Sequence, residues 1–170
     1  MGRIAEKNPR YRTKEQMAYD VASVLSSDLS FAAKYAVLAD TYWQWTEFYG
    51  KYNGCPFWTI NAIAEYDSNP LPNEKKYRHE HIVPKIVLNQ LLFELPSHTE
   101  ESIFRFMSSM NIGVVVTRKE DDLLSVNYRM SMPSEFIDPD SSDFHDPWLR
   151  YKRCGIKVVD RSNNDTIIVG

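Results

Sequence analysis

The chain has 170 residues, of which 43% are hydrophobic and 13% aromatic, and its formal net charge is -3. This length and composition predict one domain, spanning 1–170, with a real hydrophobic core. No stretch approaches the roughly 18 consecutive apolar residues of a membrane span, and residues 1–14 are polar, so we expect no membrane association and a cytoplasmic protein. Cys55 and Cys154 are too few and too far apart for a structural zinc site or a disulfide framework.

Basic residues are concentrated in three segments of this acidic chain, namely 1–14, 73–90 and 148–170. Acidic residues prevail over 15–72 and between Asp138 and Asp146. If the basic segments converge in the fold, they can follow a phosphate backbone despite the negative total charge. If they do not converge, they are ordinary solvated surfaces.

In chain order, a basic arm over 1–13 precedes a helical part over 14–72. Thr13 with Gln16 predicts a capping box, and either Asp28 or Ser30 is expected to cap a second helix that ends at Gly50 or Gly54. The many aromatic residues between 42 and 58 are expected mostly in the core, with a stacking or partner-binding surface as the alternative. Residues 57–66 are predicted to form a third helix, and 67–73 a loop.

Residues 73–170 mix helices and strands, which predicts an α+β fold. An extended segment over 77–82 leads into a helix that starts at Pro84, and Leu88, Leu91 and Leu92 are expected to be buried on it, with Asn89 at its surface. A further helix starts near Thr99, a strand covers 112–116, and Thr117 with Glu120 predicts a capping box for the next helix. Two short strands are expected at 156–159 and 166–169.

The sequence Tyr77-Arg78-His79-Glu80-His81-Ile82-Val83-Pro84 carries the most chemistry. Glu80 supplies a hard oxygen ligand, and His81 supplies an imidazole that titrates near neutral pH. These groups suit metal-assisted hydrolysis, in which an ion stabilises charge on a phosphate and a base takes a proton from water. The alternative is a polar strand end without chemistry.

Glu80-His81-Ile82-Val83-Pro84 resembles the first half of the HNH, or ββα-metal, nuclease motif. Further similarity to small HNH-like bacterial and phage proteins lies at 114–121, at Met132-Pro133, at Arg150-Tyr151 and at Gly155-Ile156. The resemblance covers about 77–159. It implies that 73–170 form a ββα-metal-like core with two inserted helices and a small C-terminal β element, joined to the mainly helical N-terminal half.

The resemblance implies roles for individual residues. Glu80 and Asp121 would hold one divalent ion, and His81 would activate water. Asp121 stands where the family carries a ligand on the helix, and an oxygen donor there favours Mg or Mn over Zn. His79, Asp122 and His145 are additional candidate ligands. The family's histidine at the helix position is absent.

The resemblance further implies a DNA substrate, hydrolysed at its phosphodiester bonds. Basic residues around the motif are the candidates for contact with nucleic acid: Lys75, Lys76, Arg78, Lys85, Arg118 and Lys119. The alternative function is a binding protein that keeps the scaffold without the chemistry, such as a phage-encoded inhibitor or a protein-interaction module. The expected location is the cytoplasm of a bacterium, or of the bacterial host if the protein is encoded by a phage.

Overall fold

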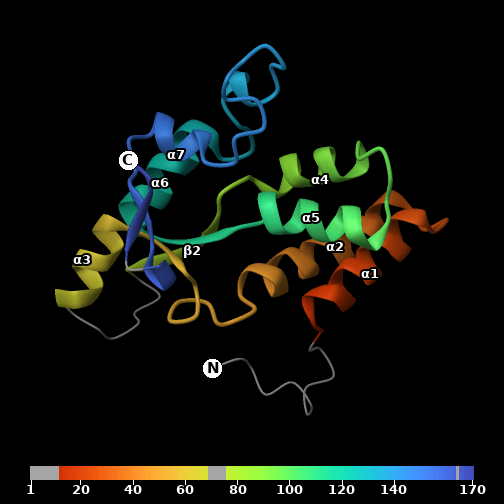
Figure 1. The fold of residues 1–170 in the computed structure, drawn as a ribbon, viewed down its shortest axis with the longest axis horizontal. Helices are drawn as coiled ribbons and strands as arrows, with labels where there is room; N and C mark the ends of the chain where they lie inside the picture. Colours follow the sequence, from red (N-terminus) through yellow and green to blue (C-terminus); the bar gives the residue numbers. More distant parts are fainter. Residues whose placement is uncertain (1–11, 69–75, 164) are drawn as a thin grey trace.

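The computed structural model describes residues 12–68, 76–163 and 165–170 (Figure 1). The arm expected over 1–13, the loop expected over 67–73, and Lys75 lie wholly or mostly outside these ranges. The elements in chain order are α1 (Lys14–Ser26), α2 (Phe31–Thr46), β1 (Phe57–Thr59), α3 (Ile60–Ser68), β2 (Tyr77–His81), α4 (Lys85–Phe93), α5 (Glu100–Met110), β3 (Gly113–Thr117), α6 (Arg118–Tyr128), η2 (Ser134–Phe136), α7 (Leu149–Arg153), β4 (Val158–Asp160), η3 (Arg161–Asn163) and β5 (Thr166–Val169). The predicted α+β class is therefore confirmed.

The five strands form one mixed sheet in the order β2-β3-β1-β4-β5. β3 runs antiparallel to β2 and parallel to β1, and the remaining pairs are antiparallel. Helix α3 covers one face of this sheet and α6 covers the other, while α1, α2, α4 and α5 form a helical layer beside it (Figure 1). The predicted order of strand, two inserted helices, antiparallel strand and helix is present as β2, α4, α5, β3 and α6.

Hydroxyl side chains cap α1, α2, α5 and α6, because each satisfies a backbone N–H that the first helical turn leaves without a partner. Thr13 and Thr117 complete the two predicted capping boxes, with Gln16 and Glu120 respectively. Ser30 caps α2, which resolves the choice between Ser30 and Asp28. Thr99 caps α5.

The prediction of a helix over 57–66 is wrong for its first three residues. Residues Phe57–Thr59 form β1 in the middle of the sheet, where they pair with β3 on one side and β4 on the other. Only the residues from Ile60 onward are helical. Long-range pairing decides this segment, since aromatic and β-branched residues fit a buried strand as well as they fit a helix.

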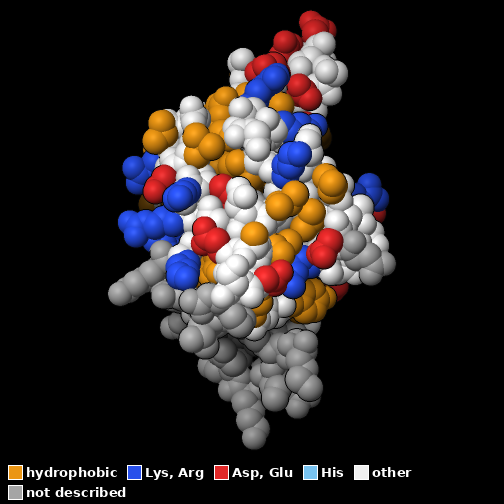
Figure 2. Space-filling model, turned by 90° about the vertical axis from the view of Figure 1, so that its left-hand side faces the viewer, with side chains coloured by type: hydrophobic (Ala, Val, Ile, Leu, Met, Phe, Trp, Pro, Cys, Tyr) orange, Lys and Arg blue, Asp and Glu red, His pale blue; other side chains and the backbone are white. Residues whose placement is uncertain are grey.

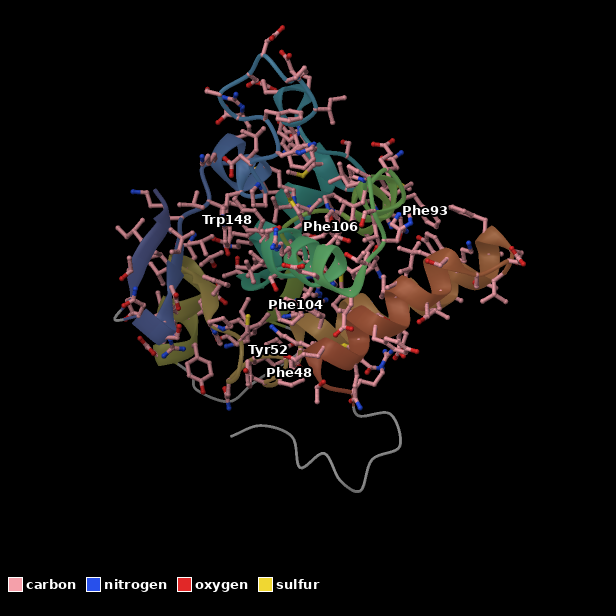
Figure 3. The ribbon with its side chains drawn as sticks, turned by 45° about the vertical axis from the view of Figure 1, so that its right-hand side comes forward. Phe48, Tyr52, Phe93, Phe104, Phe106 and Trp148 are labelled. Atoms are coloured by element: carbon pink, nitrogen blue, oxygen red, sulfur yellow. The ribbon has the colours of Figure 1, made fainter. Side chains whose placement is uncertain are left out.

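The main core lies between the helical layer and the sheet, and it includes Tyr42, Leu88, Phe106 and Val116. Aromatic side chains from several elements, among them Phe104, Phe106 and Trp148, surround this region (Figure 3). The expectation of a surface position for Asn89 is wrong. Its side chain is buried, and its Oδ1 accepts a hydrogen bond of 2.8 Å from the Tyr42 hydroxyl, which satisfies the amide inside the core.

Leu88 and Leu92 are fully buried, as predicted, whereas Leu91 is only partly buried. Replacing Leu88 with alanine should lower the free energy of unfolding by about 2 to 5 kcal/mol, because it removes apolar contacts and leaves a cavity. Ile86 lies on the same helix with its side chain exposed, so Ile86→Ala is the matched control and should cost under about 1 kcal/mol. Denaturant titration measures both values, and equal losses would contradict the assigned packing of α4.

The acidic segment between η2 and α7 projects from the rest of the molecule. Red carboxylate side chains gather at the tip of this projection in Figure 2. The segment contains Asp138, Asp140, Asp143 and Asp146. In the described ranges, no helix has both the length and the apolar character needed to cross a membrane.

Candidate functional site

The side chains of β2 alternate between the two faces of the sheet. Tyr77, His79 and His81 are buried on one face, while Arg78 and Glu80 are half-buried on the other. This follows from the period of two in a β-strand. The structure therefore brings His79 and His81 to the same side, as expected, but separates the imidazole of His81 from the carboxylate of Glu80.

Four charged side chains meet on the Glu80 face of β2. The Arg150 guanidinium lies 2.6 Å from the Glu80 carboxylate, and Arg78 lies 3.7 Å from the carboxylate of Asp121 on α6. Burial raises the pKa of Glu80 and of Asp121, and the attraction of the neighbouring arginine opposes the rise in each case. The negative charge of Asp121 also raises the pKa of Glu80, so the two carboxylates are close enough to interact. The two predicted metal ligands thus share a face.

Arg150 is the residue that organises this face. Its side chain is 1% exposed, and it donates hydrogen bonds to the backbone carbonyls of Ile82, His81 and Tyr128 in addition to Glu80. A guanidinium has five N–H donors in a rigid plane and stays charged when buried. Arg150 therefore ties α7 to the end of β2 and to the end of α6.

The histidine face is buried and packs against α2. The ring of His81 meets the edge of Trp43 at a centroid distance of 4.3 Å, and the Nδ1 of His79 lies 3.8 Å from a Glu47 carboxylate oxygen. Burial lowers the pKa of His79 to about 4, and burial together with the nearby His79 lowers the pKa of His81 to about 3. Both rings are thus neutral at pH 7.

Gly113 lets the His79 ring lie directly against β3. A Cβ at position 113 would come within 2.3 Å of the His79 Nε2 atom. Neither ring nitrogen of His79 has a hydrogen-bond partner in the described part of the chain, and the same holds for Nε2 of His81. Three of the four ring nitrogens of His79 and His81 thus have no hydrogen-bond partner among the described residues.

The additional candidates lie apart from the Glu80 face. Asp122 is exposed on α6. His145 lies in the acidic segment with a positive φ of 55°, stacks on Phe144, and lines a cavity of about 620 Å³ between α4 and α5. Apolar residues such as Leu91 and Phe106 line this cavity, and none of the residues of the Glu80 face is part of its lining.

The candidate nucleic-acid contacts divide into two groups. Lys76, Arg118 and Lys119 are exposed, and the backbone N–H of Arg118 donates to the Lys76 carbonyl at 3.0 Å, so these residues are neighbours. Arg78 lies beside them through its contact with Asp121. Lys85 forms the second group: its ammonium lies 4.8 Å from the centroid of the Trp43 ring, and its charge lowers the pKa of Glu80.

The two candidate metal ligands of the Glu80 face are already in contact with arginine side chains. Two carboxylates are present there, but each contacts a guanidinium, and a cation would have to displace both arginines. Within the described ranges, no group of three or more histidine, cysteine, aspartate or glutamate residues is arranged to hold a metal ion. The imidazole of His81 is on the far side of the strand. No catalytic step through a metal ion follows from this arrangement.

Comparison with known proteins adds no relative: no family model, curated protein or solved structure matches the chain significantly. The assignment of the protein to the α+β class therefore rests on its own helices and sheet.

Sequence reasoning assigned no role to Arg150, Trp43 or Glu47. Arg150 lies in one of the segments that resemble HNH-like proteins, and this resemblance is the sequence feature that could have indicated a role for it. Its partners are 22 to 70 residues away in the chain, so no local pattern could reveal them. Trp43 was one of many aromatic residues in its region, and only the fold places it over the histidines.

Proposed function

We propose that the protein binds the phosphate backbone of DNA without cleaving it. The binding surface is formed by Lys76, Arg78, Arg118 and Lys119 at the junction of β2 and α6, and we call it the β2–α6 surface. One observation carries the proposal: the alternation of β2 turns the imidazole of His81 away from the carboxylates of Glu80 and Asp121, which are themselves held by arginines.

The electrostatics of the β2–α6 surface support a phosphate ligand. Three exposed basic side chains lie around the first turn of α6, and the N-terminus of a helix carries a partial positive charge that favours anions. Lys76 and Arg118 are held side by side by a backbone hydrogen bond across the start of β2. A globally acidic chain can bind DNA in this way when its basic groups converge locally.

A binding assay tests the proposal directly. Fluorescence anisotropy with a short labelled DNA duplex should show saturable binding that weakens as salt rises, because phosphate contacts release counterions. An Arg118→Gln, Lys119→Gln double variant should weaken binding and reduce the slope of log K against log salt by about 2, since each phosphate contact contributes about 1. Arg105→Gln is the control, because Arg105 is exposed and paired with Glu101 on α5. Unchanged binding in the double variant would refute the assigned surface.

A cleavage assay addresses the chemistry separately. Incubation of the protein with DNA and Mg²⁺ or Mn²⁺ should yield no product. The experiment should include Glu80→Gln, which removes one of the two negative charges on that face. If the unaltered protein cuts DNA and this variant does not, the binding proposal gives way to a nuclease.

The second candidate function is a metal-dependent endonuclease of the HNH type. It is favoured by one observation, that Glu80 and Asp121 are brought to the same face although 41 residues separate them in the chain. This function requires both guanidinium groups to leave the carboxylates before an ion can bind. It also requires a base other than His81, whose imidazole is buried against Trp43.

A further inference from the structure

A small cavity of about 200 Å³ lies where α2 and α5 end and where β1 and β3 begin. Its lining includes Lys14, Trp45, Tyr49, Phe57, Asn111 and Gly113. None of these residues belongs to the β2–α6 surface. The cavity is smaller than the 300 to 1,000 Å³ or so that accommodates drug-sized ligands, so a single aromatic ring is the scale of molecule that it suits.

Lys14 places a cation at this cavity among aromatic rings. Its ammonium lies 4.9 Å from the centroid of the Trp45 ring, 5.8 Å from Phe48 and 6.0 Å from Tyr49. Phe48 and Phe104 mark this end of the helical layer in Figure 3, and Phe104 packs edge-on against Trp45. Burial lowers the pKa of Lys14. The charge of the neighbouring Glu15 opposes this fall in pKa, and the faces of the three rings also stabilise the ammonium.

Asn111 brings a second unsatisfied group to the same lining. It is 1% exposed, and its Nδ2 donates a hydrogen bond of 3.2 Å to the Tyr42 carbonyl. Its Oδ1 accepts no hydrogen bond from any described residue. A buried acceptor without a donor is costly, and native structures rarely keep one unless a water molecule or a ligand completes it.

We propose that this cavity binds a small aromatic carboxylate that carries a hydroxyl group. The carboxylate pairs with the Lys14 ammonium, the ring packs against Trp45 and Tyr49, and the hydroxyl donates to the Oδ1 of Asn111. A cationic ligand is disfavoured because it would meet the like charge of the Lys14 ammonium, which lies 4.9 Å from the centroid of the Trp45 ring. The proposal is independent of DNA binding.

Calorimetric titration of the full chain with three probes tests this assignment. The probe 4-hydroxybenzoate should bind saturably at one site. Benzoate lacks the hydroxyl donor and should bind about tenfold more weakly, and 4-hydroxybenzyl alcohol lacks the carboxylate and should bind at least about tenfold more weakly, since about 1.4 kcal/mol is tenfold in affinity. No saturable heat with 4-hydroxybenzoate, or equal affinities for the three probes, would overturn the proposal.

Two variants locate the site. Lys14→Met keeps the length of the side chain and removes its charge, so it should lose the preference for 4-hydroxybenzoate over the alcohol. Lys157→Met removes one charge from an exposed position outside the cavity and should bind like the unaltered protein. Undiminished binding to a folded Lys14→Met protein refutes the assignment. If that variant does not fold, the comparison of the acid with the alcohol on the unaltered protein decides the matter.

Discussion

Replacing Arg150 with methionine should lower the free energy of unfolding by about 3 to 5 kcal/mol, because removing one partner of a buried ion pair leaves the other without compensation. In this protein the loss extends beyond Glu80. The Arg150 guanidinium also donates to the carbonyls of Ile82 and His81, which would have no donor in the variant. Urea titration followed by circular dichroism measures the change.

Arg153 provides the control for this experiment. It lies on the same short helix, but its side chain is 45% exposed and pairs with Glu135 and Asp143 at the surface. Arg153→Met should therefore change the free energy of unfolding by about 1 kcal/mol or less. A loss at Arg150 no larger than the loss at Arg153 would show that the buried guanidinium does not hold α7 to β2.

Acidification from pH 7 to pH 5 should destabilise the protein by about 3 to 4 kcal/mol through His79 and His81. The folded protein has pKa values of about 4 and about 3 for these rings, whereas an unfolded histidine titrates near 6.5. As the pH falls through 6.5, both histidines become protonated in the unfolded state but stay neutral in the folded state. The contribution of these two histidines to the free energy of unfolding is therefore fully present above about pH 6.5 and is lost steadily below it.

Unfolding midpoints measured between pH 7 and pH 5 test this expectation. A double variant, His79→Gln with His81→Gln, should have lower stability at every pH because it disturbs the packing against Trp43. Its midpoint should nevertheless depend much less on pH over this interval. If the slope is the same in both proteins, the two imidazoles are not buried in the neutral form.

The parts of the fold that the sequence predicts correctly rest on local patterns. The capping box of Thr117 and Glu120 is one example, because three residues are enough to specify it. Glu120 also accepts hydrogen bonds from Thr59 and Asn61, about 60 residues away. That second role depends on where β1 lies in the sheet, so no pattern near position 120 could indicate it.

The candidate site shows the same division. The motif lies on β2, and the helix after β3 brings Asp121 near Glu80. Glu80 and His81 are adjacent in the sequence, which suggested a shared role. Side chains of adjacent residues in a strand, however, point to opposite faces of the sheet. The pairing of Glu80 with Arg150 spans 70 residues and required the structure.

The connection between β2 and β3 has a consequence for folding. These strands pair antiparallel, with His79 opposite Val115 and Glu80 opposite Val114, yet α4 and α5 intervene where a hairpin would have a tight turn. No turn geometry can therefore fix the alignment of the two strands. A slip by one residue would drive Glu80 and Arg78 into the apolar side of the sheet and expel both histidines to the charged side. Correct alignment thus depends on the side chains themselves, and the penalty for burying those two charges is what rejects the misaligned chain during folding.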